Sequence, residues 1–206
     1  MTNRIEAAPG AYLYPEFLGG DGQSAVLAAL RAVIAEVPLY VPNMPRSGKP
    51  LSVRMTNCGE LGWVSDRDGY RYQERHPVTG RPWPPIPDAI AAIWAQLLPE
   101  APAPEACLIN YYAGSAKMGL HQDRDERAFD VPVLSISLGD EARFRLGGVT
   151  RNAPTRAFAL RSGDAFTFGG ASRLAFHGVD RVLPRTSALL PEGGRFNLTL
   201  RRVNPA

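Results

Sequence analysis

The hydrophobic pattern divides the chain into two halves that predict different structures. Residues 23–37 are rich in Ala, Leu and Val and predict a helix, with Asp21 placed to cap its start. A second helix is predicted over 88–98, because Pro87 suits a first helical turn and Pro99 cannot continue a helix. The first half therefore contributes the helices.

Residues 38–87 are dense in Pro, Gly, Arg and aromatic residues and predict loops with short strands over 51–55 and 70–72. From Cys107 onward the pattern changes to the two-residue period of β-strands. The alternating segments are 133–138, 142–146, 156–160, 164–168 and 195–201. Turn residues separate them at roughly the 8–12-residue spacing of a sandwich or barrel. The sequence therefore predicts a mainly β protein of the α+β class, a jelly-roll with the two helices packed outside it.

Composition changes this picture little. The 206 residues suffice for one domain with its own core or for two small ones, and 45% hydrophobic residues are ordinary for a globular protein. No apolar run reaches the length of a membrane span, and the polar start over residues 1–6 is not expected to be a signal peptide. Cys58 and Cys107 are too few for a disulfide framework, so a cytoplasmic location is expected.

Candidate metal chemistry lies in the histidines. His121 and Asp123 are two residues apart, so on an extended segment both side chains leave the same face. His177 lies in an apolar segment that could return as a neighbouring barrel strand. Two histidines and one carboxylate occupy one face of an octahedron and leave three positions open, which suits non-haem Fe(II) oxygenases. Taken singly, His121 also fits a turn and His177 a core position, and His76 fits a structural or surface role.

The last predicted strand has two chemically different faces. One face carries Phe196, Leu198 and Leu200, and the other carries Arg195, Asn197, Thr199 and Arg201. The polar face is either solvated or directed into the barrel, where two buried arginines would need an anionic partner such as a dicarboxylate. Asn110 and Tyr112 share a face of their own segment and could donate to the same carboxylates, and Ser135 and Ser137 form another polar stripe.

These motifs occur together in a recognisable order. In sequence they are Met55-Thr-Asn-Cys-Gly59, Gly62-Trp63, Gly69-Tyr70, Asn110-x-Tyr112, His121-x-Asp123-x-Asp125, His177 and Arg195-x-Asn197-x-x-x-Arg201. The set resembles the AlkB-type alkylation-repair dioxygenases over about Leu51 to Arg202. The resemblance implies a single dioxygenase domain over 1–206 with a double-stranded β-helix core in 101–206. Residues 1–100 would hold the N-terminal helices and a nucleotide-recognition lid.

The resemblance also implies the cofactors, which are Fe(II), 2-oxoglutarate as cosubstrate and O2. His121, Asp123 and His177 would hold the iron, and 2-oxoglutarate would chelate it through its keto-carboxylate end. Arg201 would anchor the distal carboxylate. The remaining pocket residues would be Arg195, Asn197, Asn110 and Tyr112.

The reaction implied by the resemblance is oxidative demethylation of bases of the 1-methyladenine and 3-methylcytosine type, with release of formaldehyde, succinate and CO2. The damaged base must leave its stack to reach the iron. Trp63 and Tyr70 match the family's lid, His177 would also flank the base, and Asp125 would favour cationic lesions. Arg151 also matches a substrate-contacting position. Tyr72 and the loop arginines Arg67, Arg71 and Arg75 could meet phosphates, and the arginines fit a solvated face equally well.

Alternatives remain open from the sequence. The same oxidative chemistry could act on modified tRNA or another non-DNA substrate, and a jelly-roll binding module without catalysis is a second alternative. The expected partner is alkylated DNA bound as a single strand, with duplex DNA or RNA left open, and the expected state is a monomer with no membrane contact. The sequence leaves the lesion preference and the role of residues 1–50 undefined. It also leaves undefined the roles of Arg67, Arg71, Arg75 and Arg124.

Overall fold

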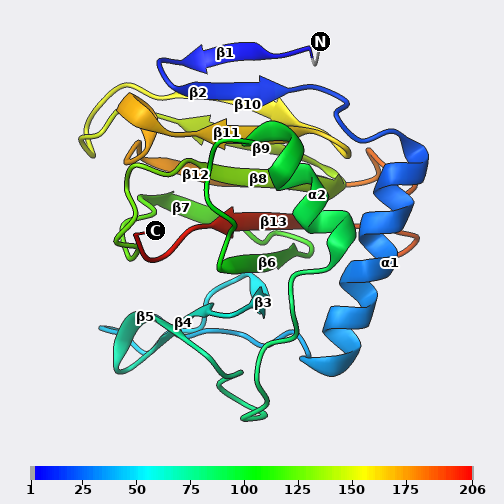
Figure 1. Cartoon of the computed structure of the whole chain (residues 1–206), viewed down its shortest axis with the longest axis vertical. Coiled ribbons are helices and arrows are strands. Elements are labelled where there is room, and N and C mark those ends of the chain that lie inside the picture. The colour runs from blue at the N-terminus through cyan, green and yellow to red at the C-terminus, as the bar shows by residue number, and fades with distance from the viewer. Residues whose placement is uncertain (1–2, 206) are drawn as a thin grey trace.

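The computed structural model describes residues 3–205 as two β-sheets, a separate β-hairpin and two α-helices (Figure 1). The larger sheet has the strand order β1-β2-β11-β8-β13-β6-β3. In that order its strands are Ile5–Ala8, Ala11–Tyr14, Ala165–Phe168, Val133–Gly139, Arg195–Arg201, Ala106–Tyr112 and Arg54–Gly59. All of the pairings in this sheet are antiparallel.

The smaller sheet has the order β10-β9-β12-β7. Its strands are Arg156–Leu160, Glu141–Leu146, His177–Leu183 and Met118–His121. Strands β6 to β13 therefore form two four-stranded layers, β11-β8-β13-β6 and β10-β9-β12-β7, as in a double-stranded β-helix. The predicted mainly β, jelly-roll fold is confirmed.

The helices and the two sheets pack through two hydrophobic cores. In the first, α1 (Gly20–Glu36) and α2 (Asp88–Leu97) cover the outer face of the larger sheet, as Figure 1 shows. Leu30, Ile90 and Trp94 from the helices belong to the same buried cluster as Leu198 and Leu200 of β13. The second core lies between the sheets and contains aromatic residues of β9 and β11. Among residues 3–205, no helix has the length and apolar content needed to cross a membrane.

The helices form because their apolar positions recur on one face, but their ends differ slightly from expectation. α1 begins at Gly20, and Gly19 is its N-cap without a side-chain hydrogen bond. The predicted cap at Asp21 is therefore wrong, since Asp21 lies inside the first turn, where its charge still suits the helix dipole. Pro87 is the N-cap of α2, one position before the first turn.

The strands of the first half depart further from the sequence pattern. The strand expected over 51–55 is β3, which runs from Arg54 to Gly59. The strand expected over 70–72 is confirmed as β5 (Gly69–Gln73), which pairs with β4 (Gly62–Asp66). Strands β1 and β2 were not predicted. They extend the larger sheet beyond β11, and Arg156 Nη1 donates to the carbonyl of Ala7 at 2.9 Å.

The helix-to-sheet core predicts a large stability cost for Leu30→Ala. Leu30 is fully buried, and truncating such a leucine costs about 2–5 kcal/mol through lost transfer free energy and a residual cavity. Urea unfolding followed by circular dichroism measures the free energy. Arg31→Ala, on the exposed side of the same helix, is the control, and equal losses for the two variants would contradict the packing.

Candidate active site

Three candidate metal donors converge where β7 ends and β12 begins. His121 is the last residue of β7, His177 is the first of β12, and the two are paired in register. Asp123 Oδ1 lies 3.7 Å from His121 Nε2 and 3.8 Å from His177 Nε2. Neighbouring ligands of one ion at bond lengths near 2.1 Å stand about 3 Å apart, so small adjustments would bring all three to an ion. The three donors therefore form a facial set of the kind that suits Fe(II).

In each histidine, a hydrogen bond at Nδ1 orients the imidazole so that Nε2 faces the cluster. His121 Nδ1 lies 2.9 Å from the Gly119 carbonyl, and His177 Nδ1 lies 3.0 Å from the Ala175 carbonyl. A carbonyl only accepts, so each Nδ1 carries the proton and each Nε2 presents a lone pair. Both rings are thus oriented as metal ligands.

Burial and neighbouring charges shift the pKa values of His177 and Asp123. Burial, with the adjacent His121, lowers the pKa of His177 to about 4, so its imidazole is neutral near pH 7. Burial alone would raise the pKa of Asp123, but the Arg201 guanidinium and the two imidazoles hold that pKa well below its usual range. Asp123 is therefore a carboxylate with one oxygen free to face the histidines.

Close approach of β7 and β12 requires glycine beside His177. A Cβ on Gly178 would stand 2.6 Å from the Met118 carbonyl oxygen, far inside van der Waals contact. The absence of this side chain lets the backbone of β12 come near β7 and brings the two histidine rings to 4.4 Å between centroids.

The polar face of β13 points into the barrel, which excludes the solvated alternative. Arg195, Thr199 and Arg201 are buried, and their strand pairs place Asn110 and Ser137 beside Asn197. Arg195 donates through Nη2 to Ser137 Oγ at 2.8 Å. Its Nε and Nη1, and Asn110 Oδ1, are buried without a hydrogen-bond partner among residues 3–205.

Arg201 has a different environment from Arg195. Its Nε and Nη2 donate to Asp123 Oδ2 at 3.0 and 2.8 Å, and Nε lies 3.4 Å from Glu126 Oε1. Arg201 is therefore hydrogen-bonded to the metal donor Asp123 and lies at the end of the inner face of β13 that is next to the metal donors. Arg195, at the opposite end of β13, keeps donors for another anion.

The β4–β5 hairpin brings aromatic residues to the same region. Trp63 and Tyr70 stack with centroids 5.5 Å apart and planes inclined by 18°. Trp63 Nε1 donates to Asp125 Oδ2 at 2.8 Å, which ties the hairpin to the segment that follows the metal donors. The buried Asn57 side chain holds the Trp63 backbone at both its N–H and its carbonyl.

Tyr72 lies elsewhere than expected. Its hydroxyl donates to Glu126 Oε1 and accepts from Arg201 Nη1 at 3.3 Å, so it faces the interior of the protein and not a bound strand. Burial, foremost, raises the Tyr72 pKa well above its usual value. The sequence analysis did not identify Glu126 or its partner Arg173. The sequence feature that could have pointed to Glu126 is its place in the run of charged residues directly after Asp123.

Other predicted residues have clear positions. Arg151 is exposed, donates to the Leu120 carbonyl at 3.3 Å and lies at the rim beside β7. Arg71 is paired with Asp66, Arg75 donates to the Gly80 carbonyl, and Arg67 is exposed at the hairpin tip. His76 is buried and bonded to the Pro38 carbonyl at 2.8 Å, which confirms a structural role and excludes a surface one.

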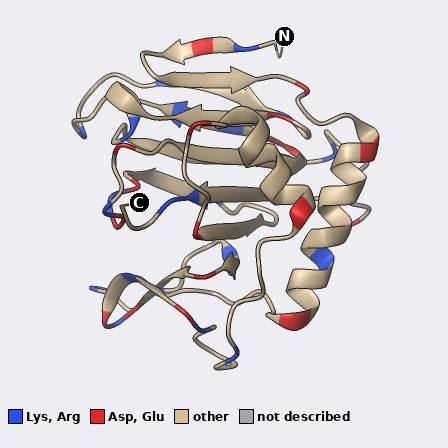
Figure 2. Cartoon of the chain, viewed as in Figure 1, with Lys and Arg blue, Asp and Glu red and all other residues tan. Residues whose placement is uncertain are grey.

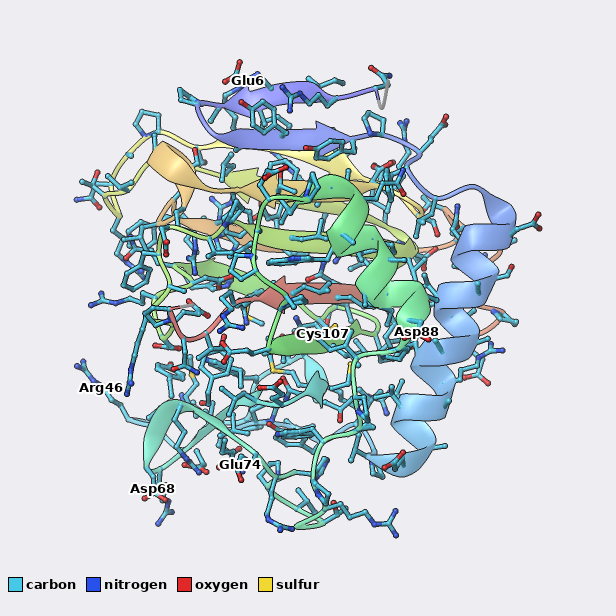
Figure 3. All side chains as sticks on the ribbon, viewed as in Figure 1. Glu6, Arg46, Asp68, Glu74, Asp88 and Cys107 are labelled. Carbon is cyan, nitrogen blue, oxygen red and sulfur yellow. The ribbon has the colours of Figure 1, made fainter. Side chains whose placement is uncertain are left out.

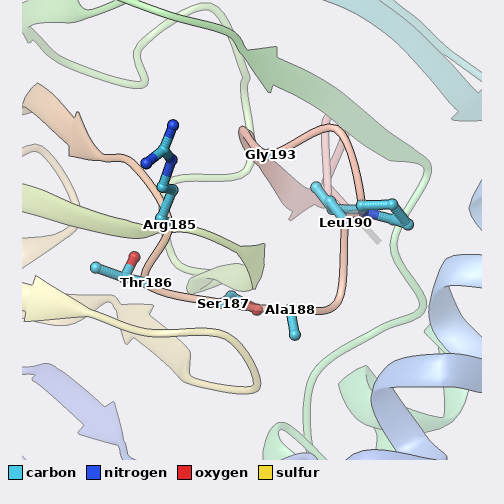
Figure 4. A pocket seen from close by; sticks show the side chains of 7 residues that line it. Arg185, Thr186, Ser187, Ala188, Leu190 and Gly193 are labelled. Carbon is cyan, nitrogen blue, oxygen red and sulfur yellow. The ribbon is translucent and has the colours of Figure 1, made fainter.

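A surface pocket lies apart from these donors. It has a volume of about 460 Å³ and is formed by the β12–β13 loop, with Arg185, Thr186 and Leu190 in its lining (Figure 4). Its lining includes neither the metal donors nor the polar face of β13. It therefore contributes nothing to the candidate site.

Comparisons with known proteins agree with this geometry. A family model described as the 2OG-Fe(II) oxygenase superfamily matches residues 10–201. The chain is 52% identical to the alpha-ketoglutarate-dependent dioxygenase AlkB homolog of Caulobacter vibrioides, over 100% of this chain and 93% of that protein. The chain belongs to the AlkB-type 2-oxoglutarate- and Fe(II)-dependent dioxygenases.

Further AlkB-type relatives span nearly the same length. The chain is 41% identical to alpha-ketoglutarate-dependent dioxygenase AlkB of Salmonella typhimurium, over 95% of this chain and 91% of that protein. The solved structure of OsALKBH1 superposes with a TM-score of 0.83 at 33% identity, over 97% of this chain and 100% of that one. As an AlkB-type dioxygenase, the protein uses Fe(II), 2-oxoglutarate and O2, and the His121–Asp123–His177 cluster fits the iron.

Loss of a metal donor should abolish tight metal binding. His121→Ala should weaken Mn²⁺, used as a stable Fe(II) substitute, by more than the roughly 10–100-fold that loss of an outer partner costs. Titration of free Mn²⁺ by electron paramagnetic resonance measures this. His76→Gln, which changes the histidine outside the cluster, is the control, and wild-type affinity in His121→Ala would contradict the donor set.

Proposed function

We propose that the protein oxidatively removes N-alkyl groups from bases of nucleic acid, of the 1-methyladenine and 3-methylcytosine type. The observation that carries this proposal is the hydrogen bond from Trp63 to Asp125, two residues after the metal donor Asp123. It places an aromatic side chain at the opening of the metal cluster, where a flipped base could stack. The related mouse protein is named nucleic acid dioxygenase ALKBH1, which supports a nucleic acid substrate.

His121, Asp123 and His177 would hold Fe(II) through two Nε2 atoms and Asp123 Oδ1. When bound, Fe(II) with 2-oxoglutarate and O2 supplies the oxidation of the N-alkyl carbon, with release of succinate, CO2 and formaldehyde. The chain's own contribution is to orient the donors through the Gly119 and Ala175 carbonyls and to keep Asp123 ionised through Arg201.

Arg195 would bind the distal carboxylate of 2-oxoglutarate. Its unpartnered Nε and Nη1 are what a buried guanidinium offers to a carboxylate fork, and burial lowers its pKa to about 10 in the absence of that anion. This exchanges the roles expected from the sequence, because Arg201 is already bound to Asp123. Tyr112 is the strand partner of Arg195, and Asn110 is that of Asn197, so these three residues line the inner face near Arg195 and would complete the pocket.

The base would lie against His121 and not against His177. The His121 side chain is 40% exposed, whereas the His177 side chain is 9% exposed and packs against Phe168 at 4.7 Å between centroids. Trp63 and Tyr70 would stack with the base. Asp125 accepts the Trp63 N–H through Oδ2, which leaves Oδ1 to stabilise a cationic base.

Exposed basic residues near the opening would bind phosphates. Ser65 Oγ donates to the Asn43 carbonyl at 2.6 Å and ties the 41–50 loop to β4, and Arg46 of that loop extends away from the body (Figure 3). Arg67, Arg124 and Arg151 are exposed as well. Figure 2 shows basic and acidic positions intermixed along the β4–β5 hairpin and the loops beside it. Binding would therefore depend on local contacts more than on a basic patch.

The finer features belong to the same proposal. Residues 1–206 would act as one catalytic domain, with the hairpin and loops of 1–100 as the recognition lid and 101–206 as the core. A single strand is the preferred substrate because its bases leave the stack at lower cost than paired bases. A monomer in the cytoplasm completes the proposal.

Turnover of methylated oligonucleotides tests the proposed function. With Fe(II), 2-oxoglutarate and O2, we expect equal amounts of succinate and restored base from single-stranded oligonucleotides carrying 1-methyladenine or 3-methylcytosine. Mass spectrometry follows both products, and His121→Ala is the inactive control. Succinate without base repair would show a different substrate class, and duplex DNA and RNA arms compare the polynucleotides.

The Arg195 assignment predicts a selective loss of cosubstrate affinity. Arg195→Ala should weaken 2-oxoglutarate binding roughly 30-fold or more, because truncating one partner of a buried charge pair costs about 2–5 kcal/mol. Arg195→Lys keeps the charge but not the fork and should lose less. The KM for 2-oxoglutarate measures both variants.

The exposed Arg181 supplies the matched control for this prediction, and Arg181→Ala should leave the KM unchanged. An Arg195→Ala protein that keeps its melting temperature and its wild-type KM for 2-oxoglutarate would refute the assignment. Mn²⁺ affinity separates the two arginines, since Arg195 touches no metal donor whereas Arg201 is bonded to Asp123.

A further inference from the structure

Four charged side chains, one of them the metal donor Asp123, are buried together in the protein interior. They are Asp123, Glu126, Arg173 and Arg201, with side-chain exposures of 4%, 1%, 3% and 7%. Two carboxylates and two guanidinium groups make the set formally neutral. Groups buried this deeply are stable only when each is paired and hydrogen-bonded, so their arrangement is tightly constrained.

Arg201 connects the metal donor to the rest of the set. It holds Asp123 Oδ2 with two hydrogen bonds, which leaves Oδ1 as the oxygen that faces both histidines. The same guanidinium lies against Glu126 Oε1 at 3.4 Å. The rotation of the Asp123 carboxylate is thus fixed by an arginine that Glu126 in turn orients.

Arg173 fixes the other side of Glu126. Its Nη2 donates to Glu126 Oε2 at 3.2 Å, its Nη1 to the Asp123 carbonyl at 2.8 Å, and its Nε to the Val131 carbonyl at 2.9 Å. All three nitrogens are therefore used. Glu126 consequently has one oxygen toward Arg173 and the other toward Arg201.

Tyr72 brings the β4–β5 hairpin into this set. Its hydroxyl donates to Glu126 Oε1 and accepts from Arg201 Nη1. The hairpin residue Trp63, which pairs with Tyr72, donates to Asp125. The adjacent residues Asp125 and Glu126 therefore both hold the hairpin, Asp125 at the surface and Glu126 in the interior. The hairpin and the metal donor are joined through Tyr72, Glu126 and Arg201.

We propose that Glu126 is a positioning residue that couples the placement of the β4–β5 hairpin to the orientation of the metal-binding carboxylate of Asp123. Metal binding at Oδ1 would fix Asp123 and Arg201, and through Glu126 and Tyr72 it would fix the hairpin. Because coupling between two sites is reciprocal, a hairpin held by substrate would strengthen metal binding by the same factor. The description of the hairpin as base-binding rests on the proposed function.

The experiment measures metal affinity and hairpin protection without any nucleic acid. Mn²⁺ affinity comes from electron paramagnetic resonance, and protection of residues 62–73 comes from hydrogen exchange with and without Mn²⁺ and 2-oxoglutarate. In the wild type we expect the metal and cosubstrate to slow exchange in the hairpin. Tyr72→Phe should remove this slowing, and Glu126→Gln should also weaken Mn²⁺ about tenfold, as loss of outer partners does.

Tyr70→Phe is the matched control, since Tyr70 lies on the same strand but is 53% exposed and outside the buried set. It should keep wild-type Mn²⁺ affinity and metal-dependent protection. If Tyr72→Phe also keeps both, or if it changes only the melting temperature, the coupling is refuted. Should Glu126→Gln fail to fold, Tyr72→Phe alone decides.

Failure of the proposed function would look different. A protein that shows the metal-dependent protection but does not repair methylated oligonucleotides would retain the coupling and lose only the substrate assignment. A wild-type protein that repairs methylated oligonucleotides, together with a Tyr72→Phe variant that keeps the metal-dependent protection, would retain the substrate assignment and refute the coupling.

Discussion

Strand β13 is buried on both faces, and the rest of the molecule depends on its alternation. Its apolar side chains pack with the two helices, while Arg195, Asn197 and Arg201 face the space between the sheets. A shift of one residue against β6 or β8 would exchange these faces and bury the arginines among leucines. The same register therefore sets both the helix packing and the polar inner face proposed to bind 2-oxoglutarate.

Arg195 and Arg201 both point into the barrel, but different partners offset the free-energy cost of burying their charges. A buried ion without compensation costs several kcal/mol. Arg201 is compensated within the chain by Asp123 and Glu126. Among residues 3–205, Arg195 has a hydroxyl partner and an aromatic ring at 5.7 Å, and the proposed 2-oxoglutarate would supply the remaining compensation. The larger apolar cores supply the stability that makes this incomplete pairing tolerable.

Much of this arrangement could be predicted from sequence periodicity. Alternation identified the faces of β13 and β6, and the spacing of His121 and Asp123 identified two donors. It could not assign the arginines, because both occupy equivalent positions in the pattern and only their partners in space distinguish them. Glu126 was missed, and Tyr72 was expected at the substrate, for the same reason, since the pairing of these two residues joins a hairpin to a distant loop.

Strand errors have a similar origin. The strand predicted over 51–55 lies too early in the chain, because β3 continues through Thr56 and Asn57, two polar residues that are buried and bonded to backbone groups. β1 and β2 each have four residues, too few to display a period. β2 pairs with the edge of β11, and β1 pairs with β2. Such nonlocal pairing is invisible to a local pattern.

The position of β1 and β2 affects how copies of the protein behave toward one another. β2 occupies the outer edge of β11, and the strands of this edge are short. If residues 5–14 detach, the backbone N–H and C=O groups of β11 become a template for the corresponding strand of another copy. Strand exchange and aggregation would then begin at the end of the chain farthest from the chemistry, and the colloidal stability of a preparation would depend on ten residues that contribute no catalytic group.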